Sequence, residues 1–127
     1  PPTEQRVTDL TRRVIDDAIA RGPAVVVGRG AKTYLEKRDD VLHVLCCAPM
    51  DALVARVMAR DQLDAAEAGA LVLEKNRQRA EHVRRYFHRD WLAPDHYHLS
   101  VNTGWLGVDG AAALVLSVAQ QRFGLAE

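Results

Sequence analysis

Arg29 is the residue whose setting most clearly offers a ligand-binding side chain. It lies between Gly28 and Gly30, directly after the apolar run 24–27. Glycine lets a ligand approach the backbone closely, and the guanidinium fork of arginine matches the oxygens of a phosphate or a carboxylate. The same pattern also fits a turn that carries a solvated arginine, so both interpretations stay open at this point.

A second group of cations lies in the stretch 75–89, where Glu81 is the single acidic residue. Seven residues make nearly two helical turns, so Arg77 and Arg84 share a helix face with His88, whereas Arg79 lies off that face. Such a helix suits a lid that clamps a polyphosphate, a nucleic-acid contact, or an ordinary solvated surface. The basic residues of the stretch are Lys75, Arg77, Arg79, Arg84, Arg85 and Arg89.

The whole-chain charge weighs against nucleic acid as the partner. The 127 residues carry 17 basic and 17 acidic side chains, and one aromatic pair, Tyr86-Phe87, interleaves the basic stretch. Nucleic-acid-binding surfaces are basic overall and use aromatic side chains to stack on bases. The histidines predict no metal site either, because no carboxylate or thiolate joins His96 and His98 at a ligand spacing.

Two further features bear on the compartment. No apolar run approaches the roughly 20 residues of a membrane span, and no signal-peptide pattern opens the chain. Cys46 and Cys47 are neighbours in an apolar run and belong to no CxxC motif, so we interpret them as buried small hydrophobic residues in a reducing compartment. We therefore expect a cytoplasmic protein with no membrane partner.

The elements that must position these residues alternate between helices and short apolar strands. Hydrophobic spacing predicts helices over 3–21, 31–37, 51–60, 65–87 and 108–123, and strands over 24–27, 41–47 and 98–102. Asp64 and Glu67 form a capping box before the long helix, and 103–107 is expected to be a turn. This order predicts an α/β fold with a parallel sheet, whose ligands bind at the carboxyl ends of the strands.

These segments together resemble the cytidylate-kinase-like family of P-loop nucleoside monophosphate kinases. Residues 25–29 resemble the strand whose terminal arginine meets the acceptor phosphate, and 43–49 the next core strand. Arg77 and Arg79 match the lid arginines, 84–91 the connection out of the lid, and 97–103 the final strand. The resemblance implies a three-layer, P-loop kinase-like parallel sheet flanked by helices.

The resemblance also implies the reaction and the roles of individual residues. ATP with Mg²⁺ would donate a phosphoryl group to a nucleoside monophosphate, with CMP as the expected acceptor. Arg29, with Gly28, would bind the acceptor phosphate. Arg77 and Arg79 would be catalytic, and Arg84 would be a further substrate-binding arginine. No residue of the chain is implied as a metal ligand.

Two departures from the family pattern matter. Asn76 stands where the family usually has a lid aspartate, which removes a charge near the phosphates. The Gly-rich phosphate-binding loop and its lysine are absent, because no GxxxxGK[ST] occurs in the sequence. In the family's sheet the P-loop strand lies between the strands that we equate with 24–27 and 41–47. Without it, each of these apolar strands has an unpaired edge, which is costly for buried backbone.

We therefore expect residues 1–127 to be one domain's carboxyl-terminal portion, incomplete without an upstream P-loop strand, and the start at Pro1-Pro2 agrees with this. Three alternatives remain: an upstream half exists, the two strands pair directly, or another chain (a second copy or a strand-supplying partner) completes the open edge. The expected function is phosphoryl transfer once a P-loop segment is joined, with no activity alone. The alternative is a non-catalytic nucleotide-binding or assembly module derived from a kinase.

Overall fold

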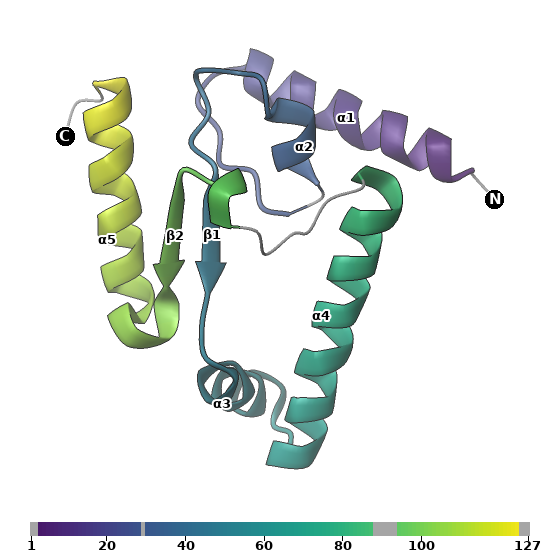
Figure 1. Ribbon diagram of the computed structural model, residues 1–127, viewed down its shortest axis with the longest axis vertical. Helices are drawn as coiled ribbons and strands as arrows, with labels where there is room; N and C mark the ends of the chain where they lie inside the picture. Colours follow the sequence, from purple (N-terminus) through teal and green to yellow (C-terminus); the bar gives the residue numbers. More distant parts are fainter. Residues whose placement is uncertain (1–2, 29, 88–93, 125–127) are drawn as a thin grey trace. The chain divides into compact units, whose positions relative to one another are not determined.

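The computed structural model describes residues 3–28, 30–87 and 94–124. The chain divides into two compact units, Pro1–Val41 and Leu42–Glu127, and each is described by itself. Figure 1 shows the helices and strands of both.

The first unit is built on two helices, α1 (Glu4–Ala20) and α2 (Ala31–Leu35). The hydroxyl of Thr3 accepts a hydrogen bond from the Arg6 backbone N–H at 3.2 Å and caps α1. Gly30 precedes α2 with a φ of 68°, a left-handed conformation that glycine adopts without strain. The helices meet through a small core of Ile15, Ala31 and Leu35, against which Ile19, Tyr34 and Val41 pack.

The predicted strand over 24–27 is wrong. These residues have no regular secondary structure, and Val25 and Val27 are 92% and 85% exposed. β-Branched composition favours a strand only where a neighbouring strand takes up the backbone hydrogen bonds. The sheet among the described residues does not include this segment. Direct pairing of 24–27 with the next strand, one of the three alternatives, is therefore not what the structure adopts.

The second unit contains a parallel pair of strands, β1 (Val44–Cys47) and β2 (Leu99–Asn102), as the sequence predicted for these two segments. Val44 lies opposite Leu99, and Cys47 opposite Asn102. His43 fixes the start of the pair, because its backbone N–H donates to His98 Nδ1 at 2.9 Å and its carbonyl accepts from His98 N at 2.9 Å. The two imidazole rings stack with centroids 5.2 Å apart.

The described part of the crossover between these strands contains two helices and a 3-10 turn. The helices are α3 (Met50–Asp61) and α4 (Ala65–Phe87), and η1 (Pro94–His96) precedes β2. Asp64 Oδ1 accepts from the Glu67 backbone N–H at 2.8 Å, so the predicted cap of the long helix is confirmed. α3 packs against α4, where Ala68 and Val72 are buried. Hydrophobic spacing predicts that Leu53, Val54 and Val57 of α3 face the core, and these side chains are half-buried.

Helix α5 (Thr103–Phe123) packs on both strands and begins earlier than the sequence predicted. Asn102 Oδ1 accepts hydrogen bonds from the backbone N–H groups of Gly104 and Trp105, both at 3.0 Å, so 103–107 starts a helix rather than forming a turn. Gly107, with φ 77° and ψ 162°, breaks the helix once. No described helix is long and apolar enough to span a bilayer.

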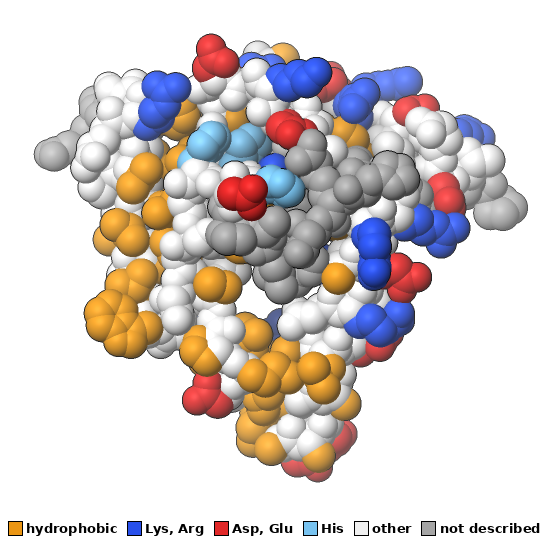
Figure 2. Space-filling model, viewed as in Figure 1, with side chains coloured by type: hydrophobic (Ala, Val, Ile, Leu, Met, Phe, Trp, Pro, Cys, Tyr) orange, Lys and Arg blue, Asp and Glu red, His pale blue; other side chains and the backbone are white. Residues whose placement is uncertain are grey.

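Two burial expectations for this unit are wrong. Cys46 and Cys47 are exposed, because a sheet of two strands leaves the end of β1 with few neighbours to cover it. The hydrophobic spacing of 108–123 predicts that Leu114 faces inward, but this side chain is 41% exposed, since α5 is apolar on most of its circumference and only part of it meets the sheet. Figure 2 shows hydrophobic side chains gathered on the α5 side of the molecule and around α3.

Candidate functional site

The carboxyl ends of β1 and β2 meet at one edge of the sheet, where parallel α/β folds bind ligands. Thr103 joins the two strand ends, because its hydroxyl donates to the Cys47 carbonyl at 3.2 Å. Arg56 on α3 reaches the same residue: Nη1 donates to Thr103 Oγ1 at 2.9 Å and Nη2 to the Thr103 carbonyl at 2.7 Å. One threonine thus connects both strands to the helix that follows β1.

Gly104 lets the first turns of α3 and α5 come close together at this edge. A Cβ atom built on Gly104 would lie 2.8 Å from Pro49 Cδ and 3.2 Å from Ala52 Cβ. The first distance is shorter than real Cβ contacts allow, so the two helices approach this closely because the side chain is a hydrogen atom.

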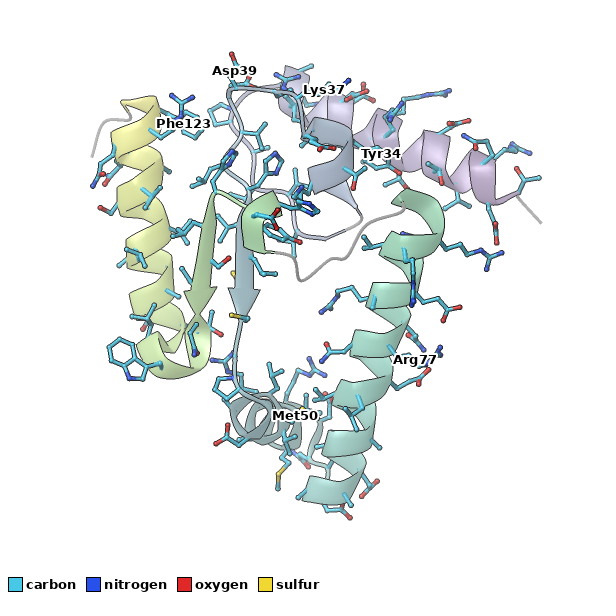
Figure 3. The ribbon with its side chains drawn as sticks, in the orientation of Figure 1. Tyr34, Lys37, Asp39, Met50, Arg77 and Phe123 are labelled. Atoms are coloured by element: carbon cyan, nitrogen blue, oxygen red, sulfur yellow. The ribbon has the colours of Figure 1, made fainter. Side chains whose placement is uncertain are left out.

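Arg77 on α4 is bound by carboxylates of its own helix. Its Nε and Nη2 donate to the two oxygens of Glu74 at 3.0 and 2.7 Å, and Nη1 donates to Glu81 Oε2 at 2.8 Å. These hydrogen bonds, with one from Gln78, lower the pKa of Glu74 to about 2, and the same carboxylates raise the pKa of Arg77. Figure 3 shows the Arg77 side chain lying along the surface of α4, where it is 60% exposed.

The two predicted lid arginines leave α4 on nearly opposite sides. Residues two apart on a helix are about 200° apart around its axis, so Arg77 and Arg79 do not point to one place. Arg79 lies seven residues after the buried Val72, on the same side of α4, but is itself exposed. Asn76, four residues after Val72, is half-buried on that side as well. Arg84 is exposed and follows Arg77 by seven residues, so these two share a side as predicted.

The remaining predicted site residues belong to the first unit. Arg29 lies outside the described residues. Gly28 is described and has a φ of 68°; apart from its chain neighbours, no atom of the described residues lies within 4 Å of the position of a Cβ. The positive φ is the conformation for which a glycine is needed at this point of the chain.

The described residues contain no cluster of ligating side chains that could together hold a metal ion. Across 3–28, 30–87 and 94–124, no group of three or more His, Cys, Asp or Glu side chains could hold a metal ion. The chain therefore offers no ready set of carboxylate ligands for a divalent cation in the part that the structure describes.

The family assignment rests on the sequence as a whole. The sequence model of the cytidylate kinase-like family matches residues 1–104. The chain belongs to the cytidylate kinase-like family. The resemblance predicted from the segments between Val25 and Thr103 is thereby confirmed. No curated protein matches the chain.

A solved structure shows the same fold. The chain is similar to the crystal structure of an uncharacterized protein from Eubacterium ventriosum ATCC 27560, with a TM-score of 0.80 and 20% sequence identity. The match covers 91% of this chain but 64% of that one, so this family member spans less than two thirds of the solved chain.

Sequence reasoning missed the contact between Arg56 and Thr103. Both residues lie in segments that the sequence singled out, the helix after β1 and the end of the last strand. They are 47 residues apart, however, and no local pattern connects residues at that separation. Only the parallel pairing of β1 with β2 brings them together.

Proposed function

We propose that this member of the cytidylate kinase-like family is the acceptor-and-lid part of a nucleoside monophosphate kinase. Joined to a P-loop segment, it would transfer the γ-phosphate of ATP to a nucleoside monophosphate, with CMP as the proposed acceptor. The family match over residues 1–104 carries this proposal. The arginine-rich half of α4 supports it, because kinases stabilise phosphoryl transfer mainly by positioning and by positive charge.

The proposed P-loop strand fits the edge of β1 that faces away from β2. Within the described residues β1 pairs with β2 alone, and its last two residues are exposed. A strand added there would supply the missing backbone partners and widen the sheet toward the proposed three-layer kinase architecture. The length of the similar solved chain, of which this one covers 64%, leaves room for such a segment in a related protein.

The arginines have distinct proposed roles. Arg29, with the open backbone of Gly28 beside it, binds the acceptor phosphate. Arg79, which is exposed on the side of α4 that carries Val72, meets the transferring phosphoryl group. Arg77 must exchange Glu74 and Glu81 for phosphate oxygens, so it joins the site only when the lid closes on a highly charged ligand. Arg84 adds positive charge on the same side as Arg77.

The donor is proposed to be ATP with Mg²⁺, as the family implies. No residue of this chain is assigned as a magnesium ligand, because the described part holds no suitable group of acidic side chains. Magnesium in kinases is held largely by the nucleotide's own phosphates and few protein groups. The proposed partners are thus a nucleoside monophosphate and ATP, in a cytoplasmic protein that binds neither nucleic acid nor membrane.

One observation favours a second candidate, a non-catalytic nucleotide-binding or assembly module. The proposed catalytic Arg77 is saturated by two carboxylates of its own helix, as expected of a structural ion pair. In that case the open edge of β1 would serve assembly, with a second copy of the chain or another strand-supplying protein.

The acceptor role of Arg29 separates these candidates. In protein expressed from the complete gene, Arg29→Ala is expected to raise the KM for CMP about tenfold or more and leave the KM for ATP within about twofold. A coupled assay with ATP, Mg²⁺ and CMP, UMP or AMP measures both constants. Arg38→Ala is the matched control, because Arg38 forms an exposed pair with Asp40 at 2.8 Å in the same unit. Equal losses for both nucleotides, or none, would contradict the assignment.

A further inference from the structure

The α3–α4 pair meets the sheet through a small group of residues at the strand ends. Pro49, Ala52 and Arg56 come from α3 and its start, and Thr103 and Gly104 from the start of α5. We call these five residues the hairpin joint. They lie at the carboxyl edge of the sheet, between the element that carries the proposed lid arginines and the strands that hold the proposed nucleotide site.

Two independent contacts at the hairpin joint determine how α3 is placed against the start of α5. The first is steric: the missing side chain of Gly104 lets Pro49 and Ala52 approach the first turn of α5. The second is polar: the guanidinium of Arg56 makes two hydrogen bonds to Thr103, at 2.9 and 2.7 Å, whose geometry fixes both the distance and the direction of α3. A two-point contact from a planar fork restrains orientation more strongly than a single hydrogen bond.

The hydroxyl of Thr103 connects this contact to the sheet. It accepts from Arg56 Nη1 and donates to the Cys47 carbonyl at 3.2 Å, so a single side-chain oxygen links α3, the end of β1 and the end of β2. Valine at this position would keep the volume and lose both hydrogen bonds, whereas serine would keep both. Comparing Thr103→Val with Thr103→Ser therefore separates the effect of the hydroxyl's hydrogen bonds from the effect of side-chain packing.

We propose that Arg56 and Thr103 are positioning residues, which set the orientation of the α3–α4 pair on the sheet and thereby place the lid arginines over the nucleotide site. α4 packs on α3, so a change in the direction of α3 moves the basic half of α4 with it. Phosphoryl transfer depends on the placement of charge to within about 1 Å, and a displaced lid lowers the rate of transfer rather than the affinity for the acceptor. The catalytic part of this inference rests on the proposed function; the structural part does not.

The structural part is tested by the distance between α4 and α5. Leu73 and Leu116 are both exposed, so dyes attached in a Leu73→Cys/Leu116→Cys variant report this distance by single-molecule energy transfer. The background is the complete protein with Cys46→Ser and Cys47→Ser. Thr103→Val and Arg56→Lys are expected to broaden the distance distribution, and Thr103→Ser to leave it unchanged. Thr11→Val, which removes a hydroxyl bond within α1, is the control. An unchanged distribution in both Thr103→Val and Arg56→Lys overturns the proposal.

The catalytic part is tested by kinetics on the same variants without dyes. Thr103→Val is expected to lower kcat about tenfold and to leave the KM for CMP within about twofold, while Thr103→Ser restores kcat. A raised KM with unchanged kcat would overturn the positioning role. If the complete protein transfers no phosphoryl group to any nucleotide, the proposed function fails, and the distance distributions alone decide whether the hairpin joint orients α3 and α4.

Discussion

At the scale of single residues, the ion pairs of Arg77 make the stability of the fold depend on pH. Arg77 lowers the pKa of Glu74 to about 2, well below the value of about 4.3 for an unfolded glutamate. A carboxyl group with a depressed pKa stabilises the folded state above its unfolded pKa, and this contribution is lost as the pH falls from about 4.5 toward 2. The group is exposed, so the contribution is small.

Glu74→Gln is therefore expected to lower the melting temperature slightly at neutral pH and to match the unaltered protein near pH 2. Thermal unfolding followed by circular dichroism over this range measures the difference. Asp9→Asn serves as a control on an exposed carboxylate of the other unit. A difference that stays constant from pH 7 to pH 2 would show that the pair with Arg77 does not form in solution.

The opposite sides of Arg77 and Arg79 lead to different expected losses of activity. Arg79→Ala is expected to lower kcat about 100-fold, because it removes a positive charge that we propose acts on the transferring phosphoryl group. Arg77→Ala is expected to cost less, since two carboxylates already compete for its guanidinium. Arg122→Ala, near the end of α5, controls for the loss of a surface arginine. Initial rates with ATP and CMP give these values, and an Arg79→Ala enzyme as fast as Arg122→Ala would contradict the lid assignment.

At the scale of elements, two glycines in helices have opposite expected responses to alanine. Gly69, inside α4, has its nearest neighbour, Val54 Cγ2, at 4.0 Å from an added Cβ, so Gly69→Ala is expected to stabilise the fold by about 1 kcal/mol through helix propensity. Gly104→Ala places a methyl group 2.8 Å from Pro49 and is expected to destabilise it by about 1–3 kcal/mol. Urea unfolding measures both, and a neutral Gly104→Ala would mean that α3 does not approach α5 this closely.

The same elements show which parts of the fold the sequence could predict. The helix α4 was predicted from its spacing and from the local pair of Asp64 and Glu67, because a cap and a hydrophobic period act over a few residues. The strand expected over 24–27 was not found, since strand formation depends on a neighbour that the segment itself does not encode. The exposure of Cys46 and Cys47 has the same cause, because the burial of a strand is set by what covers it.

The candidate site, too, could be predicted from the sequence only in part. The composition of α4 and its helical period placed Arg77 and Arg84 on one side and Arg79 on another, as the structure has them. The carboxylates that bind Arg77 include Glu74, which lies just outside the basic stretch and whose contact requires side-chain geometry. The hydrogen bonds of Arg56 to Thr103 span 47 residues and follow only from the pairing of β1 with β2. Arg29 lies outside the described residues, so its role stays a prediction.

At the scale of the whole molecule, we propose that the edge of β1 opposite β2 determines whether the protein can transfer a phosphoryl group. Within the described residues the sheet has two strands, and residues 24–27 are exposed rather than paired. The family assignment is the reason that we propose a P-loop strand at this edge. We therefore expect the lid, the acceptor site and the donor site to work only as one assembled sheet.

The formation of CDP from ATP and CMP, followed by ³¹P NMR, tests this account most directly. The protein from the complete gene and the chain of residues 1–127 alone are compared at equal concentration with Mg²⁺. The account predicts CDP from the complete protein and none from residues 1–127 alone, since the latter lack a phosphate-binding loop for ATP. Phosphoryl transfer by residues 1–127 alone, or none by a complete protein that contains a P-loop, would contradict it.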